Sequence, residues 1–460
     1  MNLATKPARA YDWAAFRSEI DGIRVYDDPK QVELRSRDYF WYSPILSEDI
    51  GHFVGDLVVI PADEEEVRRV AAAAARLRIP ITIRGGGTGN YGQCVPLEGG
   101  IILDMTKIDR VLSIEPGRVR VQAGARIARL DDAVRETGQE LLMYPSTRRI
   151  ATIGGFFTGG SGGIGSLRHG MLRDDGNIYS VKVMTLEPEP KIIELHGHDI
   201  QKVQHAYGTN GIVMELEIGL TEKTDWIHTA ALFDSYDATL RFCLKALEEK
   251  LDCYLLTTVD RRFSRFYTKF GDLFPADRDA VFAMIAPEEQ ERFAELAASF
   301  GGRVSFSMTQ DELHANGLQP AYECGWNHTT LQALKAEEGW TYLQVAYPRP
   351  FDPETVMRQM ERYGDDQYMH HEMARLEGEV QIFGLPLVRY KDRDDTYRVI
   401  RELEELDGCD IYDPHAFTIE DGGMKQIDTM QIEFKKLADP FGLLNPGKTR
   451  GWTADMAAKD

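Results

Sequence analysis

Two glycine-dense stretches constrain this chain more than any other feature of its sequence. The first, Arg84–Gln93, has five glycines in ten positions, and the second, Gly154–Ser166, has seven in thirteen. Glycine loses more conformational freedom on folding than any other residue, so this density requires a compensating gain. Close approach of the backbone to a ligand supplies one, because successive N–H groups can converge on an anion. The two stretches therefore predict loops that bind a phosphate-containing ligand, in preference to flexible surface loops.

Both stretches contain the dinucleotide-binding pattern G-x-G-x-x-G, at Gly87–Gly92 and at Gly160–Gly165. That fingerprint requires a helix directly after it, and glycines or a proline follow each stretch instead. No Gly-Lys-Ser or Gly-Lys-Thr closes either stretch, so the P-loop pattern is also absent. We expect loops that hold phosphate groups without a helix behind them.

Changes in glycine content and patterning predict four segments. Residues 1–53 are predicted to be an N-terminal helical extension, and residues 54–222 a glycine-rich domain with alternating strand and helix signals. Residues 223–425 contain acidic helical stretches between apolar β-like runs, which is typical of a separate α+β domain. Residues 426–460 are predicted to return to the first domain as a helix and a turn-rich loop.

Local signals within the glycine-rich segment are specific. Asp63 is a good N-cap for a helix that Pro80 ends. Ile81–Arg84 is a short β-branched strand that leads directly into the first glycine stretch, and Phe53–Ile60 also reads as a strand. The turn chemistry of Asp439–Lys448 predicts a loop near the C-terminus.

The net charge of −21 is unevenly distributed. Residues 1–220 hold 26 basic and 30 acidic side chains, whereas residues 221–460 hold 27 and 44. An acidic chain without a basic patch repels a phosphate backbone, which excludes nucleic acid as a partner. The excess of acid falls on the half that is predicted to form the separate α+β domain.

The five cysteines are widely spaced and include no C-x-x-C pair. Zinc ribbons, iron–sulfur clusters and a disulfide framework therefore lack support, and a reducing cytosol fits best. Residues 1–10 lack the apolar core of a signal peptide, and no run of about 18 apolar residues occurs. These features predict a cytoplasmic protein without a transmembrane segment.

Six motifs, in order along the chain, carry a family resemblance. They are Arg84-Gly-Gly-Gly-Thr-Gly89, Ile101-Ile-Leu-Asp-Met105, Ala151-Thr-Ile-Gly-Gly155, Gly160-Ser-Gly-Gly-Ile-Gly165, Tyr207-Gly-Thr-Asn-Gly-Ile-Val213 and Asp439-Pro-Phe-Gly-Leu-Leu-Asn-Pro-Gly-Lys448. Together they resemble the FAD-binding domain of the vanillyl-alcohol oxidase/p-cresol methylhydroxylase (PCMH) superfamily. The match spans roughly residues 50–222 and 426–452, and the chain is similar to the glycolate oxidase/D-lactate dehydrogenase flavoprotein branch. The resemblance implies an α+β fold, in which a PCMH-type FAD-binding domain of two subdomains carries an α+β cap domain built on an antiparallel sheet.

The resemblance also implies where FAD lies. The first glycine loop would donate to the pyrophosphate, the second would pass beside the ribityl chain and the isoalloxazine, and the C-terminal loop would approach the flavin. The residues implied in FAD binding are Arg84, Gly85, Gly86, Gly87, Thr88, Gly89, Asn90, Gly92, Pro145, Ser146, Thr152, Gly154, Gly155, Gly159, Gly160, Ser161, Gly162, Gly163, Ile164, Gly165, Ser166, Gly211, Ile212, Asn445 and Lys448. Thr88 stands where relatives that attach FAD covalently from this loop carry histidine. The FAD is therefore expected to be non-covalent, and a link from a cap histidine is left open.

Relatives that act on 2-hydroxy acids carry the motifs H-x-G-D-G-N-x-H and E-H-G-I-G, which hold a divalent metal and a base. Neither motif is present, and in Thr418–Gly423 Asp421 stands where the second motif has histidine. No metal site is therefore expected.

Five residues are candidates for catalysis. His415 lies close in sequence to the C-terminal loop and is a candidate base, with a hydrogen-bonding role as the alternative. Arg389 ends an apolar strand and could bind a carboxylate or phenolate, or could pair with a nearby acid. The stretches Trp326-Asn-His328 and Tyr342-Leu-Gln344 could line the substrate pocket or belong to the core, and His328 and Tyr342 are their catalytic candidates. Glu420 lies in the stretch nearest to the second motif.

His370-His-Glu372 has the composition of a ligand cluster. Adjacent residues point apart on a helix or a strand, so at most two of the three can share a site, and a satisfied or exposed pair is the alternative. The acidic second half would slow the approach of an anionic substrate unless a local arginine such as Arg389 offsets it. That field favours neutral or phenolic substrates without overturning 2-hydroxy acids.

The function implied by the resemblance is that of an FAD-dependent oxidase or dehydrogenase. It would oxidise a 2-hydroxy acid or related alcohol by hydride transfer to flavin N5. A phenolic or benzylic alcohol is the second candidate substrate, because Gly447–Trp452 resembles the phenol-oxidising branch. A third reading is an FAD subunit of a multi-subunit dehydrogenase. The electron acceptor (oxygen, quinone or a carrier protein) and a homodimeric state are left open.

Overall fold

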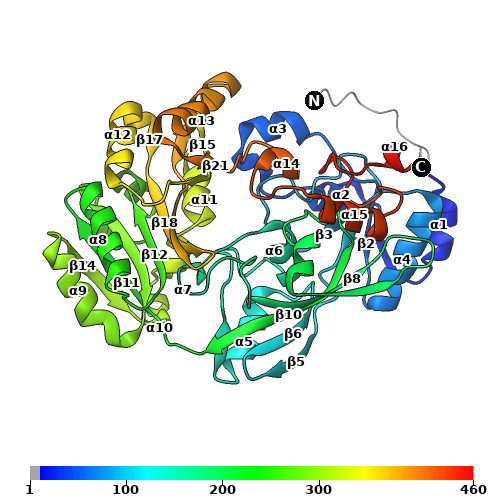
Figure 1. Ribbon diagram of the computed structural model, residues 1–460, viewed down its shortest axis with the longest axis horizontal. Helices are drawn as coiled ribbons and strands as arrows, with labels where there is room; N and C mark the ends of the chain where they lie inside the picture. The colour runs from blue at the N-terminus through cyan, green and yellow to red at the C-terminus, as the bar shows by residue number, and fades with distance from the viewer. Residues whose placement is uncertain (1–10, 459–460) are drawn as a thin grey trace.

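The computed structural model describes residues 11–458. Figure 1 shows two blocks of structure side by side. Strands β1 to β10 and the C-terminal helices α15 (Thr429–Ala438) and α16 (Ala454–Ala457) form one block, and helices α8 to α13 with their strands form the other. The chain therefore returns to its first block after building the second.

The first sheet of the first block has the strand order β1-β2-β4-β3. Strands β2, β4 and β3 are parallel, and β1 is antiparallel to β2. The bounds are β1 Arg24–Tyr26, β2 Leu57–Ile60, β3 Ile81–Arg84 and β4 Ile101–Asp104, with helices α1 Trp13–Glu19, α2 Pro29–Arg35, α3 Pro44–Ile50 and α4 Glu64–Leu77. Part of the predicted helical extension is thus a sheet strand, and the strand expected from Phe53 begins only at Leu57.

Helix α4 forms where the sequence predicts it. The side chain of Asp63 accepts a hydrogen bond from the backbone N–H of Glu66, and three glutamates occupy the first turn. Its buried face consists of valines and alanines, among them Ala71 and Ala74, which allow close packing on the sheet. The helix therefore holds β3 in place, and the first glycine stretch begins directly at the end of β3.

The second sheet of this block has the order β5-β6-β10-β8-β9, with β7 paired to the far end of β10, and all pairs are antiparallel. The bounds are β5 Val111–Glu115, β6 Arg118–Gln122, β7 Gln139–Leu141, β8 Ile178–Met184, β9 Ile192–His196 and β10 Ile212–Glu222, with helices α5 Ile127–Arg135, α6 Ile153–Gly159 and α7 Ser166–His169. Helix α6 contains the start of the second glycine stretch, so the expectation of a loop without a helix is wrong there. The cause is Thr152, whose side chain caps the helix by accepting from the N–H of Gly155 at 3.2 Å.

The second block is built on one antiparallel sheet of order β14-β11-β13-β12-β18-β19-β16-β21. The bounds are β11 Ile227–Phe233, β12 Cys253–Val259, β13 Asp279–Ile285, β14 Arg303–Met308, β16 Val345–Ala346, β18 His370–Leu376, β19 Glu379–Gly384 and β21 Asp410–Ile411. Alternate residues of β13 pack on opposite faces: Val281 and Ala283 lie in one apolar cluster, and Phe282 and Met284 lie in another. Both faces of this sheet are therefore covered.

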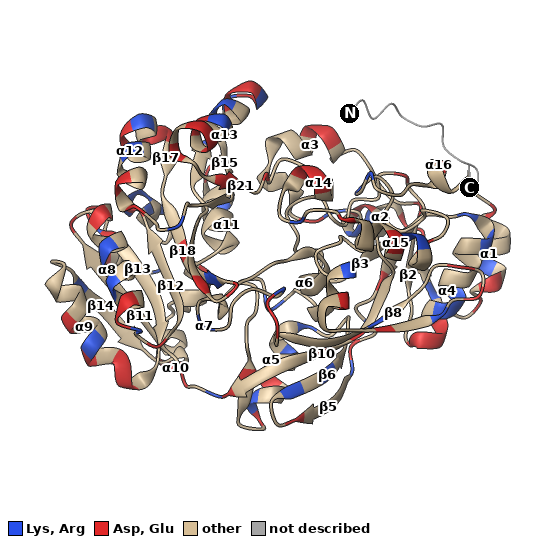
Figure 2. Cartoon of the chain, in the orientation of Figure 1, with Lys and Arg blue, Asp and Glu red and all other residues tan. Residues whose placement is uncertain are grey.

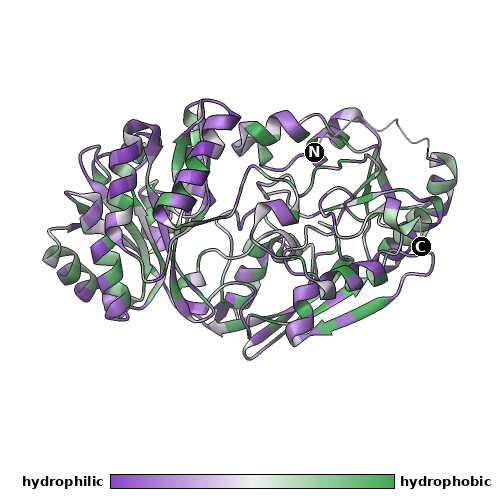
Figure 3. Cartoon of the chain, turned by 45° about the horizontal axis from the view of Figure 1, so that its top comes forward, coloured by the Kyte–Doolittle hydropathy of each residue, from purple (hydrophilic) through white to green (hydrophobic). Residues whose placement is uncertain are grey.

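Helices and short strands complete the second block. Helices α8 Tyr236–Glu248, α9 Gln290–Ser299, α12 Pro353–Tyr363 and α13 Arg393–Asp407 share an apolar cluster with one sheet face. The remaining elements are α10 Gln310–Ala315, α11 Asn327–Ala336, α14 Ile419–Gly422 and a small sheet of β15 Trp340–Tyr342, β20 Leu387–Arg389 and β17 Gln367–Tyr368. The 3₁₀ turns are Phe40–Tyr42, Gly197–Lys202, Arg261–Phe266, Gly271–Leu273, Pro287–Glu289, Ala321–Cys324 and Gly364–Asp366. In Figure 3 the helices of this block carry hydrophilic and hydrophobic residues together, as expected for helices with one face on a sheet.

The architecture confirms the predicted α+β fold class, with a first block of two sheets and a cap on an antiparallel sheet. The turn-rich loop after α15 hydrogen-bonds to β3: Ile81 donates to Leu443, and Asn445 donates to Ile81. Charged residues gather on outer helices such as α4, α12 and α13 (Figure 2). Within residues 11–458, no helix combines the length and the apolar character needed to cross a bilayer.

Candidate active site

A cavity of about 860 Å³ lies where the two blocks meet. Its walls come from both glycine stretches, from residues 198–213, from the C-terminal residues 424–431 and from the cap. The predicted FAD residues in its lining are Gly85, Gly86, Gly87, Thr88, Gly89, Asn90, Pro145, Ser146, Thr152, Gly154, Gly155, Gly159, Gly160, Ser161, Gly162, Gly163 and Gly211. The fold therefore brings segments far apart in the sequence to one cavity.

The first glycine loop presents a run of backbone donors. Among the described residues, the N–H groups of Gly86 through Asn90 donate to no protein acceptor. A Cβ on Gly86 would overlap the carbonyl oxygen of Ile150, so only glycine allows the loop to pack this closely on its neighbour. Five consecutive free donors lining a cavity are what a pyrophosphate requires, so this part of the structure fits FAD.

The positive potential that this loop presents to the cavity comes from its backbone N–H groups and not from the side chain of an arginine. The guanidinium of Arg84 donates to the backbone carbonyls of Arg35 (3.1 Å) and Arg37 (2.5 Å), and Arg84 does not line the cavity. Arg84 therefore braces the loop from behind, and its predicted role in direct FAD contact does not match its position.

The second glycine stretch packs as closely as the first. A Cβ on Gly154 would lie 2.6 Å from the Cβ of Ala123, and a Cβ on Gly163 would overlap the carbonyl oxygen of Tyr144. Tyr144 and Ile164 form an isolated antiparallel bridge that fixes this approach. The stretch thus forms a thin wall of backbone between the cavity and the sheet behind it.

Eight predicted FAD residues lie outside the lining: Arg84, Gly92, Ile164, Gly165, Ser166, Ile212, Asn445 and Lys448. Several of them hold lining segments in place. The side chain of Asn445 donates to the carbonyls of Gln93 (2.8 Å) and Tyr207 (2.6 Å), and Ser166 Oγ accepts from the N–H of Gly163 (3.0 Å). Asn445 and Ser166 therefore influence the cavity indirectly, by fixing the turns of the loops that line it.

Lys448 is buried and its Nζ has no hydrogen-bond partner among the described residues. Burial lowers the pKa of Lys448 to about 7, and Asp38 and Cys94 oppose that lowering. Burial likewise raises the pKa of Asp38 to about 6. Lys448 lies outside the cavity lining, with its Nζ 3.8 Å from where a Cβ of Gly92 would stand.

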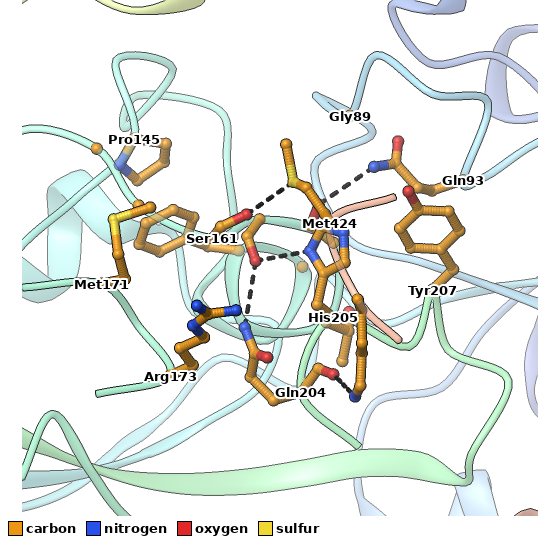
Figure 4. Close-up of a pocket in the computed structure, with 18 of the residues that line it drawn as sticks. Gly89, Gln93, Pro145, Ser161, Met171, Arg173, Gln204, His205, Tyr207 and Met424 are labelled. Atoms are coloured by element: carbon orange, nitrogen blue, oxygen red, sulfur yellow. Dashed lines mark hydrogen bonds between the residues drawn. The ribbon is translucent and has the colours of Figure 1, made fainter. Parts of the chain in front are cut away.

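Among the lining residues that the sequence did not single out, His205 and Lys425 have strongly lowered pKa values. His205, with φ of 48°, has its Nδ1 3.0 Å from the carbonyl oxygen of Gly160. Since that oxygen can only accept, Nδ1 carries the proton and Nε2 is a bare acceptor, buried and without a partner in the described chain. Burial lowers the pKa of His205 to about 4, so the ring is neutral at pH 7. Figure 4 shows this contact beside Gln204 and Ser161.

Lys425 is the second of these two residues. Its Nζ donates to the carbonyls of Gln201 (2.7 Å) and Gln204, and burial lowers its pKa to about 7. No motif surrounds Lys425 in the sequence. Its position follows from the contact of the segment before α15 with residues 201–204, which sequence spacing does not reveal.

The cap side of the cavity combines polar and aromatic side chains. Tyr91 Oη donates to Gln344 Oε1 at 2.6 Å, and Gln344 Nε2 donates to Asn327 Oδ1 at 3.4 Å. Burial raises the pKa of Tyr91 well above its usual value, so its hydroxyl stays protonated. Among the aromatic residues that line the cavity, Trp326, Phe383 and Tyr412 come from the cap, and Tyr42, Tyr91, Phe156 and Tyr207 come from the first block.

None of the five predicted catalytic residues lines the cavity. His415 Nδ1 lies 2.8 Å from Ser43 Oγ, and burial lowers its pKa to about 3. Arg389 lies over the ring of Trp340 (3.7 Å) and pairs with Glu337 (3.3 Å), in another part of the cap. The contact with Ser43 is the hydrogen-bonding role that was the alternative for His415, and the hydrogen bond from the N–H of His415 to Asp413 Oδ1 (2.8 Å) fixes the turn that carries the ring.

The other three candidates have structural partners. Tyr342 Oη accepts from Asn90 Nδ2 at 2.5 Å, so it supports a lining residue without lining the cavity itself. Glu420 accepts from Thr449 Oγ1 and from the N–H of Arg450, both at 2.7 Å. Burial lowers the pKa of His328 to about 4, and no side-chain hydrogen bond is formed by His328 within the described chain.

His370, His371 and Glu372 lie in β18 and are buried. His370 Nε2 lies 2.8 Å from Glu372 Oε1, and His371 Nδ1 lies 2.7 Å from Tyr236 Oη. The prediction that only two of the three can share a site is confirmed. Among residues 11–458, no group of three or more His, Cys, Asp or Glu side chains is arranged to hold a metal.

Comparison with known proteins agrees with this geometry. Residues 55–195 match the family described as FAD binding domain. The chain is 36% identical to the glycolate oxidase subunit GlcD of Escherichia coli (strain K12) over 135 residues, which are 29% of this chain and only 27% of that protein. It is 24% identical to GlcD of Bacillus subtilis (strain 168) over 443 residues, covering 88% of this chain and 89% of that protein.

A solved structure, that of an alkyldihydroxyacetonephosphate synthase, has the same fold. The TM-score is 0.72 with 14% sequence identity, over 97% of this chain and 86% of that one. With its cradle of backbone donors and its matching domain, the chain is a flavoprotein that binds FAD. Residues 55–195 thus form an FAD-binding domain, and the chain is similar to the GlcD glycolate oxidase subunits and the D-lactate dehydrogenases.

Proposed function

We propose that this chain oxidises a small hydroxylated substrate, foremost a 2-hydroxy acid, by hydride transfer to N5 of bound FAD. The observation that carries the proposal is the continuity of one cavity, which joins the backbone cradle of Gly86–Asn90 to the cap-side pair Tyr91–Gln344. FAD supplies the two-electron acceptor, and the protein supplies binding, orientation and exclusion of water.

The chain's own residues would hold FAD without a covalent bond. The N–H groups of Gly86–Asn90 would bind the pyrophosphate, and the wall formed by Gly159–Gly163 would lie along the rest of the cofactor. His205 would keep that wall in place through the carbonyl of Gly160. Thr88 lines the cavity and offers no nitrogen for a flavin bond. Precipitation of the holoprotein with acid should therefore release all of the FAD into the supernatant, and flavin retained on the polypeptide would contradict this.

On the substrate side, Tyr91 and Gln344 would orient the hydroxyl group. Tyr91 stays protonated and already donates to Gln344 Oε1, so the amide nitrogen of Gln344 and the tyrosine oxygen remain to contact a substrate. Asn327, the partner of Gln344 at 3.4 Å, would fix the orientation of that amide. Uncharged groups of this kind bind an alcohol in the ground state without ionising it.

The test is anaerobic reduction of the holoprotein by a panel of D- and L-2-hydroxy acids, primary alcohols and 4-alkylphenols. Loss of the oxidised-flavin absorption band with a 2-hydroxy acid is the expected result. If no member of the panel bleaches the flavin while dithionite does, the proposal is wrong.

A phenolic or benzylic alcohol is the second candidate, favoured by the aromatic lining of Tyr42, Trp326, Phe383 and Tyr412. Such a wall packs well against a ring. Bleaching by 4-alkylphenols and not by 2-hydroxy acids would decide in its favour.

We also propose a cytoplasmic location, which the five free cysteines support. The acceptor (oxygen, quinone or carrier protein) decides whether the chain is an oxidase, a dehydrogenase or an FAD subunit of a larger assembly. The E. coli relative is itself described as a subunit. Reoxidation of the reduced holoprotein by oxygen and by a soluble quinone, with purification from its source to test for a bound partner or a homodimer, distinguishes these cases.

A further inference from the structure

Among the described residues, the cavity wall contains only two lysine or arginine side chains, Arg173 and Lys425. Lys425 is half-buried, and its Nζ donates to two backbone carbonyls. The guanidinium of Arg173 has a single partner in the described chain, Glu377, with Nη2 and Oε1 3.4 Å apart. Both side chains are open to solvent, with 40% of Arg173 and 72% of Glu377 exposed. A solvent-exposed ion pair with a single long hydrogen bond has a small interaction energy.

Glu377 belongs to a tight turn of the cap that reaches the FAD-binding block. Glu377 and Gly378, with φ of 57° and 82°, join β18 to β19, and both line the cavity. The N–H of Glu377 donates to Asp174 Oδ2 at 3.1 Å, and the N–H of Met171 donates to the same oxygen at 3.1 Å. The turn is therefore docked through its backbone, and the carboxylate of Glu377 can leave Arg173 without undocking it.

The charge of Arg173 acts on both walls of the cavity. Burial is the main cause that lowers the pKa of His205 on the flavin side, and the charges of Lys425 and Arg173 lower this pKa further. Arg173 also opposes the rise that burial causes in the pKa of Tyr412 on the cap side. Figure 4 shows Arg173 in the same part of the cavity as Gln204 and His205.

We propose that Arg173 binds the carboxylate of an anionic substrate, and that Glu377 is a resident anion which the substrate displaces. This inference rests on the proposed function and names its substrate as a monocarboxylate. A guanidinium presents a planar fork that matches a carboxylate with two hydrogen bonds, where Glu377 makes only one. The entering carboxylate therefore gains a bidentate contact, and the carboxylate of Glu377 returns to water.

The neighbouring charges restrict the substrate further. Besides Arg173 and Lys425, the lining carries Asp174, Asp175, Glu377 and Asp428. Two cations against four carboxylates leave a net charge of −2 on the wall. One carboxylate can be accommodated at Arg173, but a second would face acidic side chains without a free cation. Monocarboxylates are thus favoured over dicarboxylates.

The experiment measures binding of an unreactive probe to the FAD-loaded protein. Acetate and its neutral counterpart acetamide are titrated into wild type, Glu377→Gln, Arg173→Gln, Arg173→Lys and the double variant Arg173→Gln/Glu377→Gln. Binding is followed by fluorescence of the tryptophans, of which Trp326 lines the cavity, and by the flavin difference spectrum. Arg241→Gln is the matched control, because Arg241 is also paired with acids and half exposed, but lies outside the lining.

Removal of the competing anion in Glu377→Gln should tighten acetate binding about two- to fivefold, the range expected for loss of an exposed ion pair. Arg173→Gln should weaken acetate binding more than about tenfold, and Arg173→Lys should restore part of it. In the double variant, the gain from Glu377→Gln should vanish. Acetamide binding and the Arg241→Gln control should not change.

Equal acetate affinity in wild type and Arg173→Gln would overturn the inference, as would a Glu377→Gln gain that survives without Arg173. Failure of the proposed function looks different. Acetate would bind through Arg173 as described, yet no hydroxylated compound would reduce the flavin.

Discussion

The two sides of the cavity recognise their ligands by different means. On the FAD side, consecutive N–H groups of Gly86–Asn90 would do the binding, and the guanidinium of Arg84 donates to backbone carbonyls outside the cavity. On the substrate side, the contacts would come from single side chains such as Tyr91, Gln344 and Arg173, each supplied by a different segment. A backbone site depends on loop shape, whereas a side-chain site depends on which segments the fold brings together.

This difference explains how each side tolerates change. A loop shape requires glycine wherever a Cβ would strike the neighbouring backbone, as at Gly86 and Gly163. The cap side requires only that a suitable group reach the cavity, and many positions can supply it. Substrate preference can therefore change within such a fold while the cofactor site stays the same.

The largest expected effect follows from adding one methyl group to the cradle. In Gly86→Ala, the new Cβ would overlap the carbonyl oxygen of Ile150, so the loop must shift and its N–H groups lose their alignment. We expect FAD affinity to fall at least about tenfold, since each hydrogen bond to a charged group contributes about 1.5–3 kcal/mol. The FAD-to-protein ratio after gel filtration measures this.

Gly159→Ala is the matched control for that variant. The nearest protein atom to its Cβ, Gln93 Nε2, is 3.7 Å away, so the apoprotein has room for the methyl group. We expect the Tm of the apoprotein to stay unchanged in Gly159→Ala and to fall in Gly86→Ala. Wild-type FAD retention in Gly86→Ala would refute the idea of a backbone cradle.

The second effect separates the two sides of the cavity. Gln344→Leu leaves the hydroxyl of Tyr91 without its acceptor, and it should reduce kcat/KM about tenfold to hundredfold, because an unsatisfied buried polar group costs about 1–3 kcal/mol. FAD retention should not change. Stopped-flow reduction of the flavin by the best substrate measures the loss.

Gln359→Leu is its control, because the chain repeats the same contact away from the cavity. Tyr347 Oη donates to Gln359 Oε1 at 2.6 Å, and neither residue lines the cavity. This variant should lower the Tm while kcat/KM stays near wild type. Equal losses of activity in the two variants would mean that Gln344 acts only on stability.

The contrast between the FAD side and the substrate side also explains which parts of the structure can be predicted from the sequence. The glycine stretches, the cap of α4 at Asp63 and the C-terminal loop are local signals, and each was found at its predicted place. Helix α6 was missed because glycine usually argues against a helix, and Thr152 compensates through its capping bond. Local chemistry thus predicts the FAD side well.

The substrate side could be predicted only in part. The stretches Trp326–His328 and Tyr342–Gln344 were expected to line the pocket, and Trp326, Asn327 and Gln344 do so. Arg173 and Lys425 lie in stretches without a motif, and only the pairing of distant strands and loops brings them to the cavity. His415 and Arg389 had suggestive neighbours in sequence, but their side chains contact Ser43 and Trp340 instead. A side-chain site assembled from separate segments leaves no contiguous pattern to detect.

A third effect concerns pH and the buried amine behind the cradle. The pKa of Lys448 is lowered by burial to about 7 in the folded protein, against 10.5 for the ordinary side chain. Between these values the unfolded chain holds a proton that the folded chain lacks, so stability rises with pH across this window. Lys448→Met removes the titrating group and should raise the Tm of the apoprotein by about 3 °C near neutral pH, with a gain that shrinks toward pH 10.

Lys448→Arg sharpens this test, because its charge cannot be lost and the penalty should persist at every pH. Asp38, whose pKa burial raises to about 6, titrates below the window and does not produce the same trend. Calorimetry of the three proteins across the window measures the difference. A constant gain for Lys448→Met at all pH values would show that Lys448 keeps its proton in the folded state.

The smallest expected effect comes from Arg389, the arginine that sequence reasoning preferred for substrate binding. Arg389 is one-third exposed, pairs with Glu337 and lies over Trp340, outside the cavity. Arg389→Gln should cost at most about 1 kcal/mol of stability, the range for an exposed ion pair and cation–π contact. KM for a 2-hydroxy acid should change less than about twofold. Arg389 does not line the cavity, and salt screens the interaction of exposed charges beyond about 10 Å at moderate ionic strength. A rise in KM equal to that of Arg173→Gln would mean that the substrate side extends to Arg389, and that the boundary drawn between the cavity and the rest of the cap is wrong.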